Sequence, residues 1–135
     1  MYPRARAGLA RTGRPGAERL PNPEAAEAPL TDLLPSITVE TAANPLFSVI
    51  WLHGLGADGG DFPPVVPELG LPGHPGVRFV FPHAPYLPVT CNGGYVMRAW
   101  YDIISLEPES RQIDEAGIVS SRAAVRALIE HENAR

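Results

Sequence analysis

The chain has 135 residues, 44% of them hydrophobic, which suffices for one domain of modest size with a buried core. Its formal net charge of -4 argues against a nucleic-acid partner, because phosphate binding requires a basic surface. The single cysteine, Cys91, excludes an internal disulfide framework, and the His and Cys spacing shows no zinc pattern, so we expect neither a metal nor another cofactor. With no apolar run of about 20 residues and no apolar signal core, a cytoplasmic protein without an integral membrane segment is expected.

Residues 1–33 have the composition of a disordered or linker-like extension. Five Arg occur among Pro, Gly and Ala in the first thirty residues, without any sustained hydrophobic period. Pro3 and Pro15 also disfavour the amphipathic helix of a targeting peptide. We therefore expect the folded part of the chain to occupy residues 34–135.

Two strands are predicted at the start of this folded part. Residues 37–41 alternate in the manner of a β-strand, and an Asn44-Pro45 turn separates them from the second strand, FSVIWL at 47–52. Five residues of this second run are apolar, with no polar alternation. Such a run is typical of a strand covered on both faces in a parallel sheet.

A glycine-rich turn, HGLGADGG at 53–60, follows the second strand directly. Residues 61–70 are predicted to form a short helix, with Asp61 as its N-cap, with Pro63 and Pro64 tolerated only in its first turn, and with Pro67 limiting or kinking it. VRFVF at 77–81 is predicted to be another buried strand. Strand, glycine turn, helix and strand form a β-α-β unit, which predicts an α/β fold with a doubly wound, mostly parallel sheet. Residues 82–113 are rich in Pro and Gly and are expected to be irregular.

A helix is predicted over residues 114–135, with Asp114 as its N-cap and Glu115 in its first turn. Its apolar stripe consists of Ile118, Ser121, Val125, Leu128 and Ile129. In a doubly wound sheet, a helix of this kind leads into a further strand, and this sequence contains none after it.

The glycine turn fits three interpretations. Its GLGADG core matches Gly-x-Gly-x-x-Gly, which binds a dinucleotide pyrophosphate, but the next strand ends in Phe81-Pro82-His83 and offers no carboxylate for a ribose. The preceding His-Gly instead fits an oxyanion hole, in which a backbone N–H points at a carbonyl oxygen. A tight turn with glycines for steric reasons alone is the third possibility.

Four motifs in order favour the oxyanion hole. They are LHGLGADG at 52–59, FVFPHAPYLPVT at 79–90, NGG followed by MRAWYDI within 92–103, and DEAGI at 114–118. Together they resemble the carboxylesterase, lysophospholipase and acyl-protein thioesterase family of the α/β-hydrolase fold, over roughly residues 34 to 135. The resemblance implies hydrolysis of small carboxylic esters, thioesters or lysophospholipids through an acyl-enzyme.

The resemblance also implies roles for individual residues. The backbone N–H of Leu55 would be one oxyanion-hole donor, and Gly54 and Gly56 would let the backbone turn without a Cβ clash. His53 would shape the loop through hydrogen bonds rather than act as the catalytic base. A hydrophobic wall for the substrate would consist of Met97, Trp100 and Tyr101, although the last two could equally seal the core.

Two further residues are given no catalytic role. His83 is expected to be structural, and Cys91 lacks the electropositive surroundings that a nucleophilic cysteine needs.

The family's nucleophile lies in a Gly-x-Ser-x-Gly elbow, which this sequence lacks. None of its serines has glycines at both flanking positions; they are Ser36, Ser48, Ser105, Ser110, Ser120 and Ser121. We therefore expect the amino-terminal part of an α/β-hydrolase domain, truncated before the nucleophile strand and without nucleophile, acid or base. The 47–52 strand would form an open edge, and the chain alone would be poorly stable and inactive.

Two alternatives remain open at this point. The chain could be a non-catalytic module that binds an acyl or small acidic ligand. It could also be one half of a split hydrolase, completed by a carboxyl-terminal half on another chain.

Overall fold

The computed structural model describes residues 32–107 and 112–135. Its elements in chain order are β1 (Ser36–Glu40), β2 (Phe47–Ile50), the 3-10 turns η2 (Pro63–Val65) and η3 (Pro67–Leu69), β3 (Val77–Pro82), β4 (Tyr86–Val89), the 3-10 turn η4 (Thr90–Asn92), β5 (Tyr95–Arg98) and α1 (Glu115–Asn133). The extension expected over residues 1–33 falls almost entirely on residues 1–31, outside the described part.

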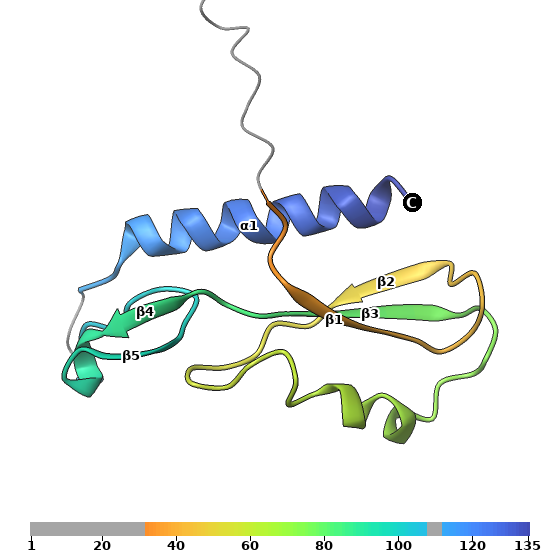
Figure 1. Ribbon diagram of the computed structural model, residues 1–135, viewed down its shortest axis with the longest axis horizontal. Helices are drawn as coiled ribbons and strands as arrows, with labels where there is room; N and C mark the ends of the chain where they lie inside the picture. Colours follow the sequence, from red (N-terminus) through yellow and green to blue (C-terminus); the bar gives the residue numbers. More distant parts are fainter. Residues whose placement is uncertain (1–31, 108–111) are drawn as a thin grey trace, which may run out of the picture.

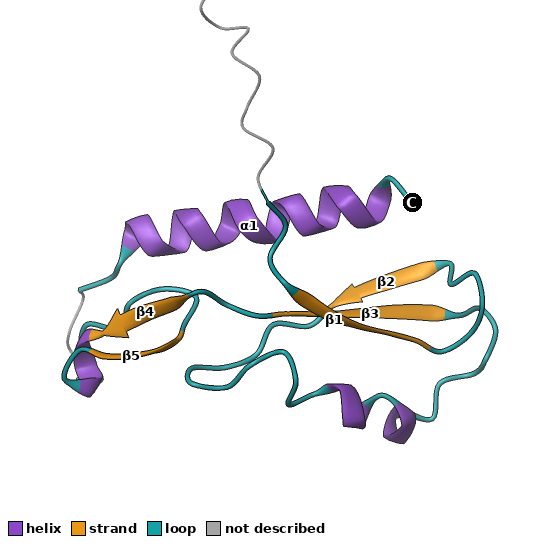
Figure 2. Ribbon diagram, viewed as in Figure 1, coloured by secondary structure: helices purple, strands orange, loops and turns teal. Residues whose placement is uncertain are grey.

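A three-stranded sheet with the order β1-β3-β2 forms the centre of the molecule. β2 runs parallel to β3 and β1 runs antiparallel to it, so the predicted crossover between two parallel strands is confirmed. Helix α1 extends along one side of this sheet, while η2 and η3 lie on the opposite side (Figure 1). The hairpin of β4 and β5 continues beyond one end of the sheet (Figure 2).

The sheet face toward η2 and η3 forms the aromatic core. Phe79 and Phe81 on β3 are almost completely buried, and their rings stack with centroids 6.0 Å apart. Trp51, just after β2, contacts both Phe81 and Phe62 through its ring. Because Val66 packs against the same cluster, the segment after the glycine turn covers this face of the sheet.

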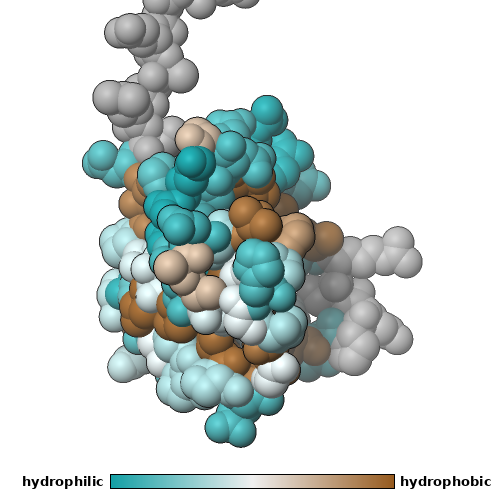
Figure 3. Space-filling view, turned by 90° about the vertical axis from the view of Figure 1, so that its right-hand side faces the viewer, coloured by the Kyte–Doolittle hydropathy of each residue, from teal (hydrophilic) through white to brown (hydrophobic). Residues whose placement is uncertain are grey.

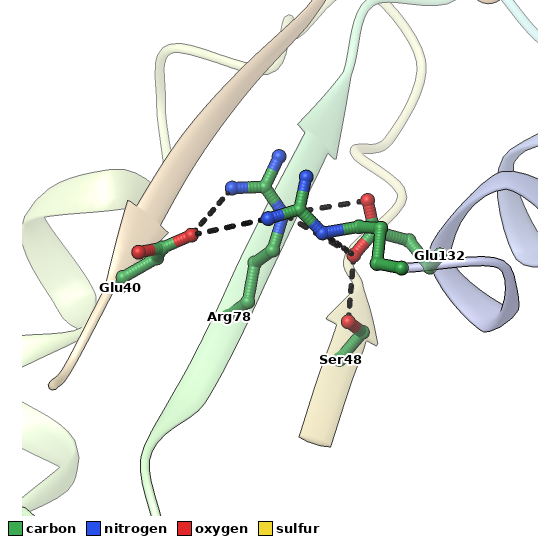
Figure 4. A network of polar contacts seen from close by, with 5 residues as sticks. Glu40, Ser48, Arg78 and Glu132 are labelled. Atoms are coloured by element: carbon green, nitrogen blue, oxygen red, sulfur yellow. Dashed lines mark hydrogen bonds and ion pairs between the residues drawn. The ribbon is translucent and has the colours of Figure 1, made fainter. Parts of the chain in front are cut away.

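The opposite face contains an ionic network between three strands and the helix (Figure 4). Arg78 on β3 bonds Glu40 on β1 at 2.7 Å and Glu132 on α1 at 3.2 Å. Ser48 on β2 donates to the same Glu132 carboxylate at 2.6 Å. These contacts join the last turns of α1 to the row of the sheet on which Glu40, Arg78 and Ser48 are neighbours.

The expectation that the 47–52 strand is covered on both faces is wrong. Phe47 is 58% exposed and Val49 is 38% exposed. Within the described residues β2 pairs only with β3, so its outer side has no neighbouring strand to exclude water. The predicted open edge is thus present in this part of the chain. The end of the molecule at which β2 begins shows brown hydrophobic areas between hydrophilic ones (Figure 3).

The short helix predicted over residues 61–70 is also wrong, because the chain forms two 3-10 turns there. Asp61 is not a helix cap. Its carboxylate accepts a hydrogen bond from the N–H of Asp58 at 3.0 Å, and the N-cap position of η2 is Phe62, whose side chain makes no capping hydrogen bond. Pro63 and Pro64 would be tolerated in the first turn of a helix, but Pro67 lacks the N–H that a continuous α-helix would use there.

Residues 82–113 are more regular than expected, since β4 and β5 pair in an antiparallel hairpin. Its loop contains η4 and ends in Gly93 and Gly94, both with positive φ (66° and 78°). The Gly-Gly pair was the available signal for a hairpin, and Pro88 in the first strand, with Pro85 just before it, concealed that signal.

The predicted helix and its N-cap are confirmed. Asp114 accepts hydrogen bonds from the N–H of Gly117 at 2.9 Å and from the N–H of Asp102 at 2.8 Å. These two bonds hold the pKa of the Asp114 carboxyl below its usual value. Of the predicted apolar stripe, Leu128 is buried, whereas Ile118 and Ile129 remain 39% and 46% exposed.

Candidate functional site

The glycine turn begins at the carboxyl end of β2, the edge of a parallel sheet at which α/β proteins commonly bind ligands. Gly56 has a φ of +73°, a conformation that residues with a side chain rarely adopt. Its N–H donates to the carbonyl oxygen of Arg98 on β5 at 3.0 Å, and the N–H of Ala57 donates to that of Gly54 at 3.3 Å. The turn is therefore hydrogen-bonded to the β4–β5 hairpin as well as to itself.

His53 lies beneath this turn and is only 3% exposed. Its Nε2 accepts a hydrogen bond from the N–H of Ala84 at 3.0 Å, and its Nδ1 lies 2.7 Å from the carbonyl oxygen of Gly54. The indole N–H of Trp100 donates to the carbonyl oxygen of His53 at 2.8 Å. The ring and backbone of His53 thus connect three separate segments of the chain.

Leu55 lies at the tip of the turn, with a side chain that is 42% exposed. Among the described residues, no acceptor is found for its backbone N–H. An oxyanion hole requires a backbone N–H that has no other acceptor and belongs to a loop whose conformation is fixed by hydrogen bonds.

The two flanking glycines differ in their steric roles. A Cβ at Gly54 would meet no atom within 4 Å, and Gly54 does not have a positive φ, so the clash expected at this position is absent. Farther along the turn, a Cβ at Gly59 would lie 2.4 Å from the carbonyl oxygen of Phe81. The strict steric need for glycine lies at Gly56 and Gly59, and the sequence pattern did not distinguish these positions from Gly54.

The three residues expected to form one hydrophobic wall lie in two places. Met97 on β5 faces the glycine turn, with its Sδ 3.7 Å from a Cβ built at Gly56. Trp100 packs its ring against that of His53, with centroids 5.2 Å apart. Tyr101 lies close to Gly117 in the first turn of α1, 3.1 Å from a Cβ built there.

An apolar groove lies between α1 and the segments that end β2 and β5, with a volume of about 530 Å³. It is lined on the strand side by Leu52, Trp100 and Tyr101, and on the helix side mainly by Ile118, Val125 and Ile129. The exposed part of the α1 stripe therefore faces this groove. Sequence patterning found both sets of residues but could not bring them together, since they are distant in the chain.

His83 has the structural contacts expected of it, because its Nδ1 accepts the N–H of Gly59 at 3.1 Å. Cys91 has no disulfide partner in the described part of the chain. Over residues 32–107 and 112–135, no group of three or more His, Cys, Asp or Glu side chains could hold a metal ion. The same residues form no helix that is long and apolar enough to cross a bilayer.

Residues 36–135 match the model of the phospholipase/carboxylesterase family. Acyl-protein thioesterase 1 of Debaryomyces hansenii is 35% identical over an alignment of 109 residues that covers 76% of this chain and 47% of that protein. Acyl-protein thioesterase 1 of Mycosarcoma maydis is 38% identical over 98 residues, which are 72% of this chain and 41% of that protein. The chain thus spans less than half the length of these curated relatives.

Solved structures agree with this similarity. Zea mays acyl-protein thioesterase 2 superposes with a TM-score of 0.60 at 29% identity, over 72% of this chain and 40% of that one. Arabidopsis thaliana SOBER1 superposes with a TM-score of 0.58 at 37% identity, over 65% of this chain and 42% of that one. The expected fold class, the amino-terminal part of an α/β-hydrolase sheet, is confirmed by these matches.

Proposed function

The chain belongs to the phospholipase/carboxylesterase family, and on that premise we propose that it forms the oxyanion-loop part of a serine hydrolase of carboxylic esters. We assign residues 34–135 to this partial domain. The observation on which the proposal mainly rests is the backbone N–H of Leu55, which has no acceptor among residues 32–107 and 112–135, on a loop that His53 and Gly56 attach to neighbouring segments. Small esters, thioesters and lysophospholipids are the proposed substrates, and the cytoplasm is the proposed location, consistent with a single cysteine.

The reaction would pass through an acyl-enzyme. A serine attacks the carbonyl carbon, a histidine takes the serine proton, and the negative charge develops on the former carbonyl oxygen. The N–H of Leu55 would stabilise that charge, together with the N–H that follows the nucleophile. Met97 beside Gly56, and the groove that Trp100 and Tyr101 line, would contact the acyl chain.

The nucleophile, the acid and the base are proposed to come from a complementing carboxyl-terminal half. Its nucleophile strand would pair with the outer edge of β2, which has no other strand beside it in the described residues. That position would place the serine next to the glycine turn, because both follow the carboxyl ends of neighbouring strands. The 135 residues alone are therefore expected to show negligible hydrolysis.

Complementation tests this proposal. The chain is expressed together with the part of Zea mays acyl-protein thioesterase 2 that lies beyond the matched region, and hydrolysis of a short-chain acyl ester is measured. Activity is expected from the pair and not from either part alone. Equal activity from the 135-residue chain by itself would contradict the proposal.

The donor role of Leu55 is tested in the same complex. Leu55→Pro removes the backbone N–H, whereas Leu55→Ala retains it and removes most of the side chain. Loss of one oxyanion donor lowers kcat by roughly 100- to 1000-fold, so Leu55→Pro should lose activity on that scale and Leu55→Ala should not. Similar activities for the two variants would exclude this N–H from the reaction.

A second candidate function is a binding module without turnover, and the apolar groove of about 530 Å³ favours it. A ligand that binds only the folded state raises the unfolding temperature. The outcome expected from this alternative is stabilisation of the isolated chain by a fatty acid, with no hydrolysis even in the complemented pair.

A further inference from the structure

The hydrogen bonds around His53 determine which of its nitrogens has the proton. A backbone N–H can only donate, so Nε2 must accept from Ala84 and cannot itself be protonated. A carbonyl oxygen can only accept, so the contact between Nδ1 and Gly54 requires a proton on Nδ1. Both contacts are satisfied together only by the neutral ring with its proton on Nδ1.

This ring fixes the orientation of the next peptide group. The Gly54–Leu55 peptide bond is trans, so its C=O and N–H point in opposite directions within one plane. His53 and Ala57 both donate to the Gly54 oxygen, at one edge of this peptide group. The N–H of Leu55 consequently points from the opposite edge, away from the buried ring.

The ring is itself held on buried structure. Ala84, its donor, is completely buried just after β3, the central strand of the sheet. Trp100 holds the backbone of His53 through its indole N–H and packs its ring against the imidazole. Because His53 is only 3% exposed, water competes little for these hydrogen bonds.

We propose that His53 is a positioning residue whose neutral Nδ1–H ring directs the N–H of Leu55 toward the substrate oxygen. This proposal rests on the proposed function, because only ester hydrolysis gives the N–H of Leu55 an oxyanion to stabilise. It makes the oxyanion donor preorganised within this chain, before any nucleophile strand is present. The side chain of His53 takes no part in proton transfer to the substrate.

Two substitutions separate the two ring contacts. The shorter His53→Asn places an amide N–H near the position of Nδ1, where it can still donate to the Gly54 oxygen. The longer His53→Gln places its amide oxygen near the position of Nε2, where it can accept from Ala84 but leaves the Gly54 oxygen without the ring donor. His53→Gln therefore tests the loss of the contact that orients the Gly54–Leu55 peptide group, and His53→Asn tests the loss of the contact with Ala84 after β3.

The test is NMR spectroscopy of the 135-residue chain. The ¹⁵N shifts of the His53 ring report its tautomer, in solution or in sedimented protein, and residual dipolar couplings report the direction of the Leu55 N–H. We expect the Nδ1–H form in the wild type, an unchanged Leu55 coupling in His53→Asn, and a Leu55 coupling averaged toward zero in His53→Gln. The residual dipolar couplings of β3 should stay constant in both variants. A change confined to Leu55 then reports reorientation of its N–H and not general unfolding.

Two results would overturn the proposal: an Nε2–H ring in the wild type, or a Leu55 coupling that is unchanged in His53→Gln. The tautomer is read on the unaltered chain, so the proposal stays testable even where a variant does not fold. Neither readout depends on hydrolysis. Equal activities of Leu55→Pro and Leu55→Ala would reject the proposed function while leaving the orientation of this peptide group intact.

Discussion

Gly59 lies so close to Phe81 that a Cβ on Gly59 would be 2.4 Å from the Phe81 carbonyl oxygen. The glycine turn therefore packs directly on the backbone of the central strand. Since that oxygen belongs to the sheet and not to a flexible side chain, it cannot move away at low cost.

Gly59→Ala should lower the free energy of unfolding by about 3 kcal/mol or more, at the upper end of overpacking effects. Gly54→Ala is the matched control in the same turn, because a Cβ there meets nothing within 4 Å. Urea denaturation of both variants measures the difference. Equal midpoints for the two would show that the turn does not pack on β3 as described.

Glu132→Gln should destabilise the fold by about 2 kcal/mol, since the substitution removes a charge that is bonded to Arg78. Both side chains are largely buried, with 6% and 15% exposure, so water replaces the lost contact poorly. Arg126→Ala breaks an exposed helical pair with Glu130 and should cost less than about 0.5 kcal/mol. Thermal unfolding compares the two, and a larger effect for Arg126→Ala would refute this assignment.

Stability should fall with acid because of Glu132 and Asp114. Burial alone would raise the pKa of Glu132, but its hydrogen bonds with Ser48 and Arg78 and the nearby arginine charges bring that pKa below the ordinary 4.5. The pKa of Asp114 lies below 3.8 because of the N–H groups of Asp102 and Gly117.

A lowered folded-state pKa adds stability above the unfolded-state pKa, and this contribution is lost as the pH falls through the folded value. The urea midpoint should therefore be level from pH 7 to about pH 5 and decline below about pH 4.5. In Glu132→Gln the decline should be shallower, and an unchanged acid slope in that variant would contradict the role of Glu132.

The open edge of β2 should cause self-association of the isolated chain. Phe47→Lys places a charge on this edge. It should lower the weight-average molar mass that analytical ultracentrifugation measures at a given concentration. Leu106→Lys is the control, because Leu106 is 75% exposed and lies outside the sheet. If both substitutions reduce association equally, general hydrophobicity and not the edge is the cause.

Local patterns in the sequence were sufficient for β3 and α1. The apolar run of β3 has the composition of a central strand, and Asp114 marks the start of the helix by its ordinary capping chemistry. Pro67 lacks the N–H that a continuous helix after the glycine turn would need, so the local sequence already limits such a helix.

Contacts between distant segments could not be predicted in this way. The exposure of Phe47 depends on which strand lies beside β2, a property that no local pattern contains. The bond between Trp100 and His53 joins residues 47 positions apart, one of them in a segment without hydrophobic periodicity. The family resemblance suggested a loop-shaping role for His53, but its hydrogen-bond partners Ala84 and Trp100 lie 31 and 47 positions away, beyond the reach of any local pattern.

The hydrogen bonds that hold the glycine turn have a consequence for the order of events during biosynthesis. The partners of His53 and Gly56 are Ala84, Arg98 and Trp100, all of which precede α1 in the chain. Synthesis proceeds from the amino terminus, so the hydrogen bonds of the turn can form while the residues of α1 are still inside the ribosome. A nascent chain would then contain a closed glycine turn beside the exposed edge of β2, and other nascent chains could pair with that edge before a complementing strand does.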